Sequence, residues 1–152
     1  MNFKVRSQSS AQTEQIGEAI GQHLKTGDCL CLSGALGAGK TQITRGIACG
    51  WGSEDRVTSP TFMLIQQYEG PPDKGALYHV DAYRLRDSHD ALTTGLGELL
   101  DTGQTLVIEW PERLMDLLPA DRIEIRLDVL DDDQRGITFN ATGPTSVARL
   151  NS

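Results

Sequence analysis

The fold is decided by a short glycine-rich stretch, which reads Gly34-Ala35-Leu36-Gly37-Ala38-Gly39-Lys40-Thr41. It follows the apolar run 29–32, which predicts a buried strand, and it precedes a helical pattern at about 40–49. The stretch matches G-x-x-x-x-G-K-[ST], the phosphate-binding loop (P-loop), in the strand-to-helix setting that this loop requires. Glycines let backbone N–H groups point at phosphate oxygens, and the positive end of the following helix adds to the attraction. The sequence therefore predicts a site for a nucleoside triphosphate.

The last residues of the P-loop carry its polar side chains. Lys40 is expected to reach the β- and γ-phosphates, and the hydroxyl of Thr41 to ligate Mg²⁺. The sequence contains no N-K-x-D motif of the kind that GTPases use to read guanine. The remaining nucleotide-binding positions that we expect in and beside the loop are Gly34, Gly37, Ala38, Gly39 and Gln42.

Strand and helix patterns alternate along the chain. Strands are expected at 3–7, 29–32, 62–68, 76–80, 105–108, 123–129 and 137–141, and helices at about 11–25, 40–49 and 88–100. We expect Ser10 to cap the first helix, the stretch Gly50-Trp51-Gly52 to end the second, and Gly95 and Gly97 to break the third. The alternation predicts a single α/β, P-loop NTPase-like domain with a mixed, mostly parallel central sheet flanked by helices and a C-terminal antiparallel hairpin. We expect this domain to span 1–143 and a loose tail to span 144–152.

The composition limits the class of protein. The 152 residues carry a formal net charge of −7, which argues against binding nucleic acid unaided, because Lys and Arg supply most of the affinity for phosphate backbones. The cysteines Cys29, Cys31 and Cys49 have neither C-x-x-C nor zinc-type spacing, which is typical of a reducing compartment. The sequence shows no signal-peptide pattern and no apolar run of membrane-spanning length, so we expect a cytoplasmic protein without a membrane partner.

Two acidic residues stand directly after predicted strands. Asp81 follows the strand at 76–80, and Glu109 follows the strand at 105–108. Open α/β sheets bind ligands beyond the carboxyl ends of their strands, so both carboxylates are candidates for holding Mg²⁺ or orienting a nucleophile beside the P-loop. The alternative is that each is a solvated strand end or a helix cap.

Three further features have two readings each. His79 shares a face with Asp81 and is either half of a metal pair or a packed core residue. Ser59 and Thr61 flank a proline and form either a switch that contacts the γ-phosphate or an ordinary turn. Trp110 is either packed in the core or in contact with a partner or substrate.

Four sequence blocks in their order and spacing resemble the TsaE (YjeE) family. They are the P-loop, S-P-T-F at 59–62, H-V-D-A-Y-R-L at 79–85 and E-W-P at 109–111, and the resemblance covers roughly 10–140. It implies a bacterial ATPase required for the threonylcarbamoyladenosine modification beside the anticodon of tRNA. It also implies TsaD-like and TsaB-like partner proteins, which transfer the threonylcarbamoyl group, while ATP hydrolysis resets the complex. Contact with tRNA would then be indirect, through that complex.

The resemblance also assigns roles to residues of the catalytic centre. It implies that Lys40, Asp81 and Glu109 are catalytic, and that Thr41 and Glu109 coordinate Mg²⁺ beside the bound ATP. Gln42 stands where the family often has a second hydroxyl, which puts the role of that hydroxyl in doubt here.

Residues farther from the phosphates receive weaker assignments from the same resemblance. Ser59 and Thr61 would belong to a switch-like segment, and Trp110 would be a functional surface residue. Ser10 and Arg135 would contact the rim of the nucleotide.

Two other functions remain open from the sequence. A P-loop kinase would transfer the phosphoryl group to a small metabolite, but the Arg-rich substrate and lid segments of such kinases are not evident. A nucleotide-dependent binding module would hydrolyse ATP only incidentally. No arginine is obviously placed as an internal finger, although Arg84 is the nearest candidate, so we expect slow turnover without partners.

Overall fold

The structure is a computed structural model that describes residues 2–35, 37–55, 57, 65–87, 89–90 and 95–150. Ser59 and Thr61 of the predicted switch lie outside these ranges, as does the expected start of a strand at 62.

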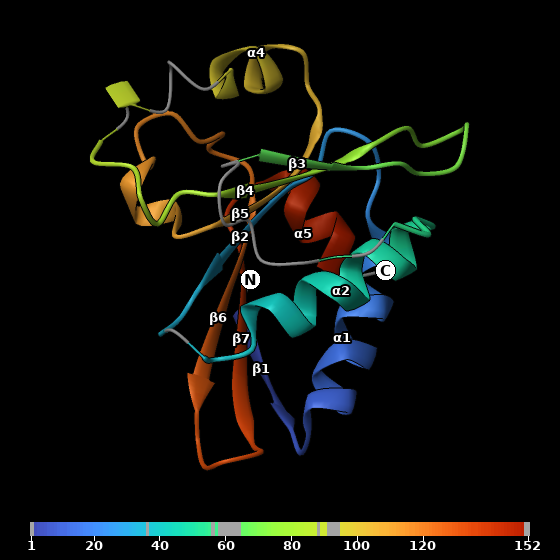
Figure 1. Ribbon diagram of the computed structural model, residues 1–152, viewed down its shortest axis with the longest axis vertical. Helices are drawn as coiled ribbons and strands as arrows, with labels where there is room; N and C mark the ends of the chain where they lie inside the picture. Colours follow the sequence, from blue (N-terminus) through green and yellow to red (C-terminus); the bar gives the residue numbers. More distant parts are fainter. Residues whose placement is uncertain are drawn as a thin grey trace.

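Seven strands form one mixed sheet through the molecule (Figure 1). In spatial order they are β1 (Asn2–Ser7), β7 (Arg135–Ala141), β6 (Ile123–Val129), β2 (Cys29–Ser33), β5 (Thr105–Glu109), β4 (Leu77–Asp81) and β3 (Ile65–Tyr68). The four neighbouring strands β6, β2, β5 and β4 run parallel. At one edge β3 pairs antiparallel with β4, and on the other side β7 pairs antiparallel with both β6 and the edge strand β1. The predicted fold class, including the C-terminal hairpin β6–β7, is confirmed.

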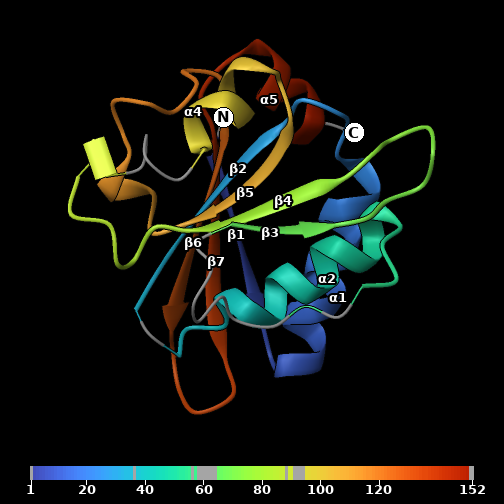
Figure 2. The same cartoon turned by 45° about the horizontal axis from the view of Figure 1, so that its top comes forward.

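Helices pack on both faces of this sheet. The helices α1 (Ser10–His23) and α2 (Lys40–Trp51) lie side by side and cover one face (Figures 1 and 2). The other face is covered over β4, β5 and β2 by α4 (Leu96–Asp101), the 3₁₀-helix η1 (Pro111–Arg113) and the segments beside them. No helix in the described part of the chain combines the length and the apolar character needed to cross a bilayer.

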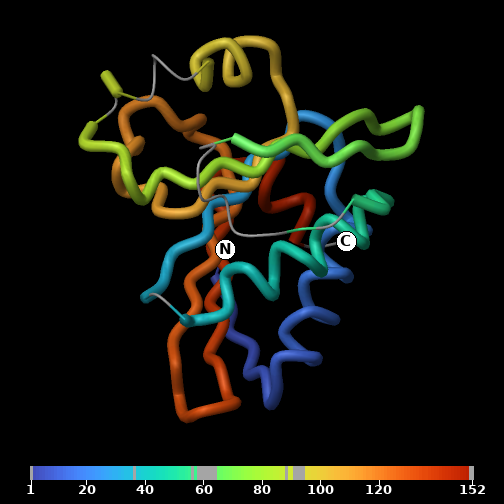
Figure 3. The backbone as a smooth tube through the Cα atoms, viewed as in Figure 1, coloured from blue at the N-terminus to red at the C-terminus, as the bar shows by residue number. Residues whose placement is uncertain are grey.

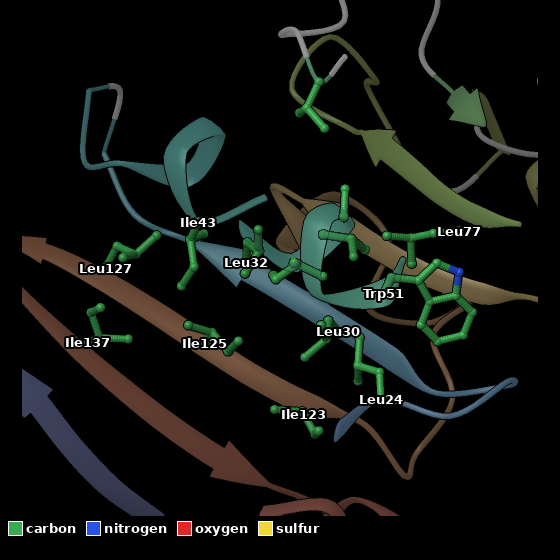
Figure 4. Packing of buried hydrophobic residues seen from close by; sticks show 14 of the residues in the cluster. Leu24, Leu30, Leu32, Ile43, Trp51, Leu77, Ile123, Ile125, Leu127 and Ile137 are labelled. Carbon is green, nitrogen blue, oxygen red and sulfur yellow. The ribbon is translucent and has the colours of Figure 1, made fainter. Parts of the chain in front are cut away.

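The central strand β2 is buried on both faces. Leu30 and Leu32 face α2 and belong to the larger apolar cluster, which Figure 4 shows together with side chains of β6 and α2. Cys29 and Cys31 alternate with these leucines and pack in the second cluster on the opposite face. A parallel strand covered on both faces requires apolar residues at every position, which explains the unbroken run 29–32.

Glycines set the close approach of α1 to α2. A Cβ atom added at Gly46 would collide with the carbonyl oxygen of Glu14, and one added at Gly50 with that of Glu18. Gly17 and Gly21 of α1 face the backbone of α2 in the same way. The predicted stop at Gly50-Trp51-Gly52 is confirmed, since α2 ends at Trp51 and Gly52 caps it with a φ of 106°. Gly50 lies inside the helix and serves helix packing.

The helix ends differ from the predictions in two places. Ser10 is the first residue of α1 rather than its cap, because the side chain of Ser9 accepts the hydrogen bond from the backbone N–H of Gln12 at 3.1 Å. Gly95 does interrupt the third helix, since it has a φ of 90° immediately before α4, but Gly97 lies inside α4.

The residues expected to form a loose tail instead form a docked helix. The helix α5 spans Pro144–Leu150, and its Ser146 is buried. The guanidinium of Arg149 forms an ion pair with Asp28 at 2.7 Å, and Leu150 packs against the larger apolar cluster. Backbone hydrogen bonds to Asp121 at 2.8 and 2.9 Å hold the start of this helix. The expectation failed because these contacts join residues far apart in the sequence.

Candidate nucleotide-binding site

The P-loop leaves the carboxyl end of the central strand β2 and leads directly into α2. Gly34, Gly37 and Gly39 have φ values of 145°, 78° and 105°, a region that residues with a side chain rarely adopt. A Cβ atom at Gly34 would also collide with the carbonyl oxygen of Leu127 on β6. The glycines therefore permit both the curvature of the loop and its position against the sheet.

Lys40 is held in place although its side chain is charged. Its Nζ donates a hydrogen bond of 2.7 Å to the carbonyl oxygen of Gly34 and lies 3.5 Å from the ring centroid of Trp110. Burial lowers the pKa of Lys40, and the carboxylates of Glu109 and Asp81 oppose that shift. The ammonium group of Lys40 therefore lies at the P-loop, close to the carboxylates of Glu109 and Asp81.

The two predicted acidic residues meet at the carboxyl edge of the sheet. Asp81 ends β4 and Glu109 ends β5, and the two are direct partners in the register of these parallel strands. Burial raises the pKa of the Asp81 carboxyl, whereas a hydrogen bond from the backbone N–H of Tyr83 lowers it. The side chain of Glu109 is almost fully buried.

One pocket of about 430 Å³ brings most of the predicted site residues together. Its lining consists of Ser10, Thr13, Gly37, Gly39, Lys40, Thr41, Gln42, Asp81, Tyr83, Glu109, Trp110, Asp133 and Arg135. Two expected loop positions are not part of this lining. Gly34 instead accepts the hydrogen bond from Lys40, and the methyl group of Ala38 packs into the apolar core.

Trp110 covers the lysine from the side of β5. It has a φ of 59°, the one positive value at a residue other than glycine in the described ranges, which is a strained conformation for a bulky side chain. Its ring contacts both Nζ of Lys40 and the ring of Tyr83, whose centroid is 4.9 Å away. The structure therefore places Trp110 in the wall of the pocket, beside a tyrosine that is 43% exposed.

Arg135 reaches the P-loop from the start of β7. Its guanidinium donates hydrogen bonds to the carbonyl oxygens of Ala38 at 3.1 Å and Gly37 at 3.3 Å. Figure 3 shows the hairpin β6–β7 passing beside the loop that leads into α2. Arg135 thus braces the P-loop as well as lining the pocket, and Ser10 lies at the pocket as the first residue of α1.

Several residues of the site were missed by the sequence analysis. Thr13 and Asp133 line the pocket but lie in none of the motifs, and Tyr83 lies in the H-V-D-A-Y-R-L block without a role assigned to it. Tyr68 was missed as well, and its hydroxyl lies 2.9 Å from Nδ1 of the fully buried His79. The D-x-Y spacing could have pointed to Tyr83, because the backbone N–H of Tyr83 donates to the Asp81 carboxylate. The other contacts depend on tertiary structure.

The oxygen donors in the pocket fit Mg²⁺. Thr41 offers a hydroxyl, and Asp81 and Glu109 offer carboxylates, which are the hard ligands that Mg²⁺ prefers. Within the described ranges, no group of three or more His, Cys, Asp or Glu side chains could hold a metal by itself. This matches the usual mode of Mg²⁺ at nucleotides, which combines one or two protein ligands with phosphate oxygens and water.

Comparison with known proteins gives a consistent result. The sequence model of the family described as "Threonylcarbamoyl adenosine biosynthesis protein TsaE" matches residues 7–137. The TsaE protein of Treponema pallidum is 40% identical over 132 residues, covering 87% of this chain and 96% of that protein. The TsaE protein of Bacillus subtilis is 38% identical over 143 residues, covering 93% of this chain and 87% of that protein.

A solved structure shows the same fold. The crystal structure of Bacillus subtilis YdiB has a TM-score of 0.80 and 32% sequence identity to this chain, over 99% of this chain and 93% of that one. The match to the family spans the strands β2 to β6 and the start of β7, and it includes all the residues that line the pocket. We conclude that the chain belongs to the TsaE family.

Proposed function

We propose that this protein is a Mg²⁺-dependent ATPase that acts in the threonylcarbamoyladenosine modification of tRNA together with TsaD-like and TsaB-like proteins. Membership of the TsaE family supports the role in this biosynthesis. The observation that carries the enzymatic part is the convergence of Lys40, Asp81 and Glu109 on one pocket at the P-loop. Because the chain is acidic overall, contact with tRNA is assigned to the complex rather than to this protein alone.

The chain's own groups bind and orient the triphosphate. Backbone N–H groups of the P-loop and the start of α2 face the phosphates. When ATP binds, Nζ of Lys40 gives up its hydrogen bond to the carbonyl oxygen of Gly34 and donates to phosphate oxygens instead. Thr41 and Glu109 would hold Mg²⁺, and the bound ion would supply neutralisation of the charge on the phosphates. Asp81, at the edge of the same pocket, orients the attacking water.

The proposal includes slow turnover of the isolated protein. Among the described residues that line the pocket, the cations are Lys40 and Arg135, and Arg135 donates to backbone carbonyl oxygens of the P-loop. Arg84 is exposed and does not line the pocket. Since an arginine that reaches the γ-phosphate accelerates such reactions about 10³- to 10⁵-fold, a partner protein is expected to supply or position the missing group.

Phosphate release and partner capture test this function together. We expect the protein to release phosphate from ATP only with Mg²⁺, and Glu109→Ala to release none. We also expect TsaD-like and TsaB-like proteins to be captured by this protein in the presence of ATP, and to increase phosphate release when they are added back. Capture is compared with and without ATP on the wild-type protein. An ATP-insensitive capture without stimulation contradicts the partner assignment.

A second arm separates hydrolysis from phosphoryl transfer to a metabolite. The protein is incubated with γ-labelled ATP and a small-molecule extract, and the label is followed over time. We expect it to appear as free phosphate. A labelled metabolite that forms faster than free phosphate supports the kinase function instead.

A further inference from the structure

A row of buried polar side chains leads to Glu109 from the edge of the sheet. The imidazole of His79 is completely buried, and its Nε2 lies 2.7 Å from Oε2 of Glu109. Its Nδ1 lies 2.9 Å from the hydroxyl of Tyr68, which in turn lies 2.7 Å from Oε1 of Gln66. The row therefore crosses β3, β4 and β5 in one layer.

The strand register explains why these side chains meet. Gln66 pairs with His79 between β3 and β4, and Asp81 pairs with Glu109 between β4 and β5. Residues two positions apart in a strand share a face, so Tyr68 and Glu109 are the diagonal neighbours of His79. This face also carries the larger apolar cluster, which includes Tyr68.

The contact between His79 and Glu109 determines which ring nitrogen of His79 carries a hydrogen toward the carboxylate. An ionised carboxylate only accepts hydrogen bonds, so Nε2 of His79 carries the hydrogen and donates it to Oε2 of Glu109. Nδ1 contacts the hydroxyl oxygen of Tyr68 at 2.9 Å, and that hydroxyl donates its own hydrogen to Oε1 of Gln66 at 2.7 Å. Among the described residues, no fully buried polar side-chain atom lacks a partner. The imidazole is thus locked in both orientation and hydrogen bonding.

We propose that His79, held by Tyr68, is a positioning residue that fixes the carboxylate of Glu109 for Mg²⁺ in the ATP complex. The hydrogen bond from Nε2 engages Oε2 of Glu109 and prevents rotation of the carboxylate, which leaves Oε1 for the pocket. Burying a row of polar side chains costs free energy that apolar side chains would not cost. What the row provides in return is directional hydrogen bonds, which hold the carboxylate of Glu109 in one orientation. This inference rests on the proposed function.

Two substitutions at position 79 separate positioning from packing. His79→Leu removes the hydrogen bond and fills the space, whereas His79→Gln keeps an N–H donor near the position of Nε2. Groups that orient metal ligands typically contribute about 10- to 100-fold to metal affinity. We therefore expect the Mg²⁺ concentration for half-saturation of the protein–ATP complex to rise by that factor in His79→Leu and to recover in His79→Gln. Binding of ATP in EDTA should stay within twofold of wild type.

Substitution of the tyrosine provides a milder test with a matched control. Tyr68→Phe removes only the hydroxyl that holds Nδ1, and Tyr78→Phe removes the hydroxyl of a tyrosine that packs on the other face of the sheet. We expect a raised Mg²⁺ requirement in Tyr68→Phe and none in Tyr78→Phe. This pair decides the matter if His79→Leu does not fold, as judged by circular dichroism.

A spectroscopic readout is independent of ATP. In ¹⁵N-labelled protein without nucleotide, the Nε2 hydrogen should give a protected, downfield proton signal that shifts in Glu109→Gln and disappears in His79→Leu. A signal of this kind on Nδ1 instead of Nε2 overturns the proposal.

The Mg²⁺ measurements also separate the two proposals. Unchanged Mg²⁺ requirements in His79→Leu and Tyr68→Phe overturn the positioning role while the wild-type protein still binds Mg²⁺ and ATP. A wild-type protein that binds ATP with no dependence on Mg²⁺ overturns the proposed function, and the positioning role with it.

Discussion

At the scale of single residues, the two carboxylates at the carboxyl edge of the sheet have different surroundings. Glu109 is buried and receives a hydrogen bond from His79, whereas Asp81 is half-buried and receives one from the backbone of Tyr83. Glu109 is therefore held rigidly, as suits a metal ligand. Burial raises the pKa of Asp81, as suits a group that interacts with water at the pocket.

The raised pKa of Asp81 predicts a gain in stability when its charge is removed. Since the native state binds this proton more readily than the unfolded state, the ionised carboxylate weakens folding at pH 7, and the weakening disappears as the pH falls toward the ordinary value of 3.8. Asp81→Asn should therefore melt above wild type at pH 7 and match it near pH 4. ATP hydrolysis should fall about 100-fold or more. Equal melting temperatures at both pH values contradict the burial argument.

The residues of the P-loop could be assigned from sequence because the motif is local. The glycines, Lys40 and Thr41 are contiguous, and the strand before them and the helix after them are visible as patterns. The support of Glu109 by His79 and Tyr68 was not predictable. It depends on which strands are neighbours, and periodicity does not encode that.

At the scale of elements, the pairing of α1 with α2 determines how the P-loop is supported. The two helices approach until backbone meets backbone at Gly46 and Gly50, and α2 begins at Lys40. A helix anchored this closely cannot shift its first turn without disturbing α1. The position of Lys40 therefore depends on glycines at the middle and end of α2.

Gly50→Ala should destabilise the protein although alanine is the better helix former. The added Cβ would collide with backbone of α1, which cannot move aside as a flexible side chain can. Overpacking of this kind costs about 1–3 kcal/mol, against a helix-propensity gain of about 1 kcal/mol. Urea unfolding measures the difference, with the exposed substitution Gln15→Ala in α1 as the control. A stabilised Gly50→Ala variant would contradict the close approach of the helices.

The helix α5 provides a second prediction at this scale. Arg149→Met should destabilise the protein by about 3–5 kcal/mol, because it leaves the buried carboxylate of Asp28 without its ion partner. The double variant Asp28→Asn/Arg149→Met should recover part of the loss, since the unpaired charge is gone. Chemical denaturation of the three proteins measures this coupling. A single variant as stable as wild type would mean that α5 does not hold in solution.

At the scale of the whole molecule, the strand order concentrates the site. The parallel strands β2, β5 and β4 are neighbours, so the P-loop, Glu109 and Asp81 all emerge at one edge of the sheet. The hairpin β6–β7 also contributes at this edge, because Arg135 at the start of β7 donates a hydrogen bond to the carbonyl oxygen of Ala38 in the P-loop. The pocket is thus assembled from segments that span most of the chain.

A pocket assembled in this way couples nucleotide binding to global stability. A ligand that binds the native state alone stabilises it by about 2.7 kcal/mol at 100 times its dissociation constant. Mg²⁺ with ATP should therefore raise the melting temperature of the wild-type protein, and the increase should vanish in Lys40→Ala. Differential scanning fluorimetry with AMP as the control ligand measures the effect. An equal increase in Lys40→Ala would place the nucleotide elsewhere.

The sequence by itself determined the fold class, the P-loop and the two strand-end carboxylates. These features rest on contiguous motifs and on the alternation of apolar residues, which local physics converts directly into strands, helices and turns. Only the tertiary structure decided that Trp110 covers Lys40, that Arg135 braces the loop, that Tyr68 and His79 hold Glu109, and that residues 144–150 form a docked helix. Those contacts join residues brought together by strand order and helix packing, and short-range patterns carry no information about such neighbours.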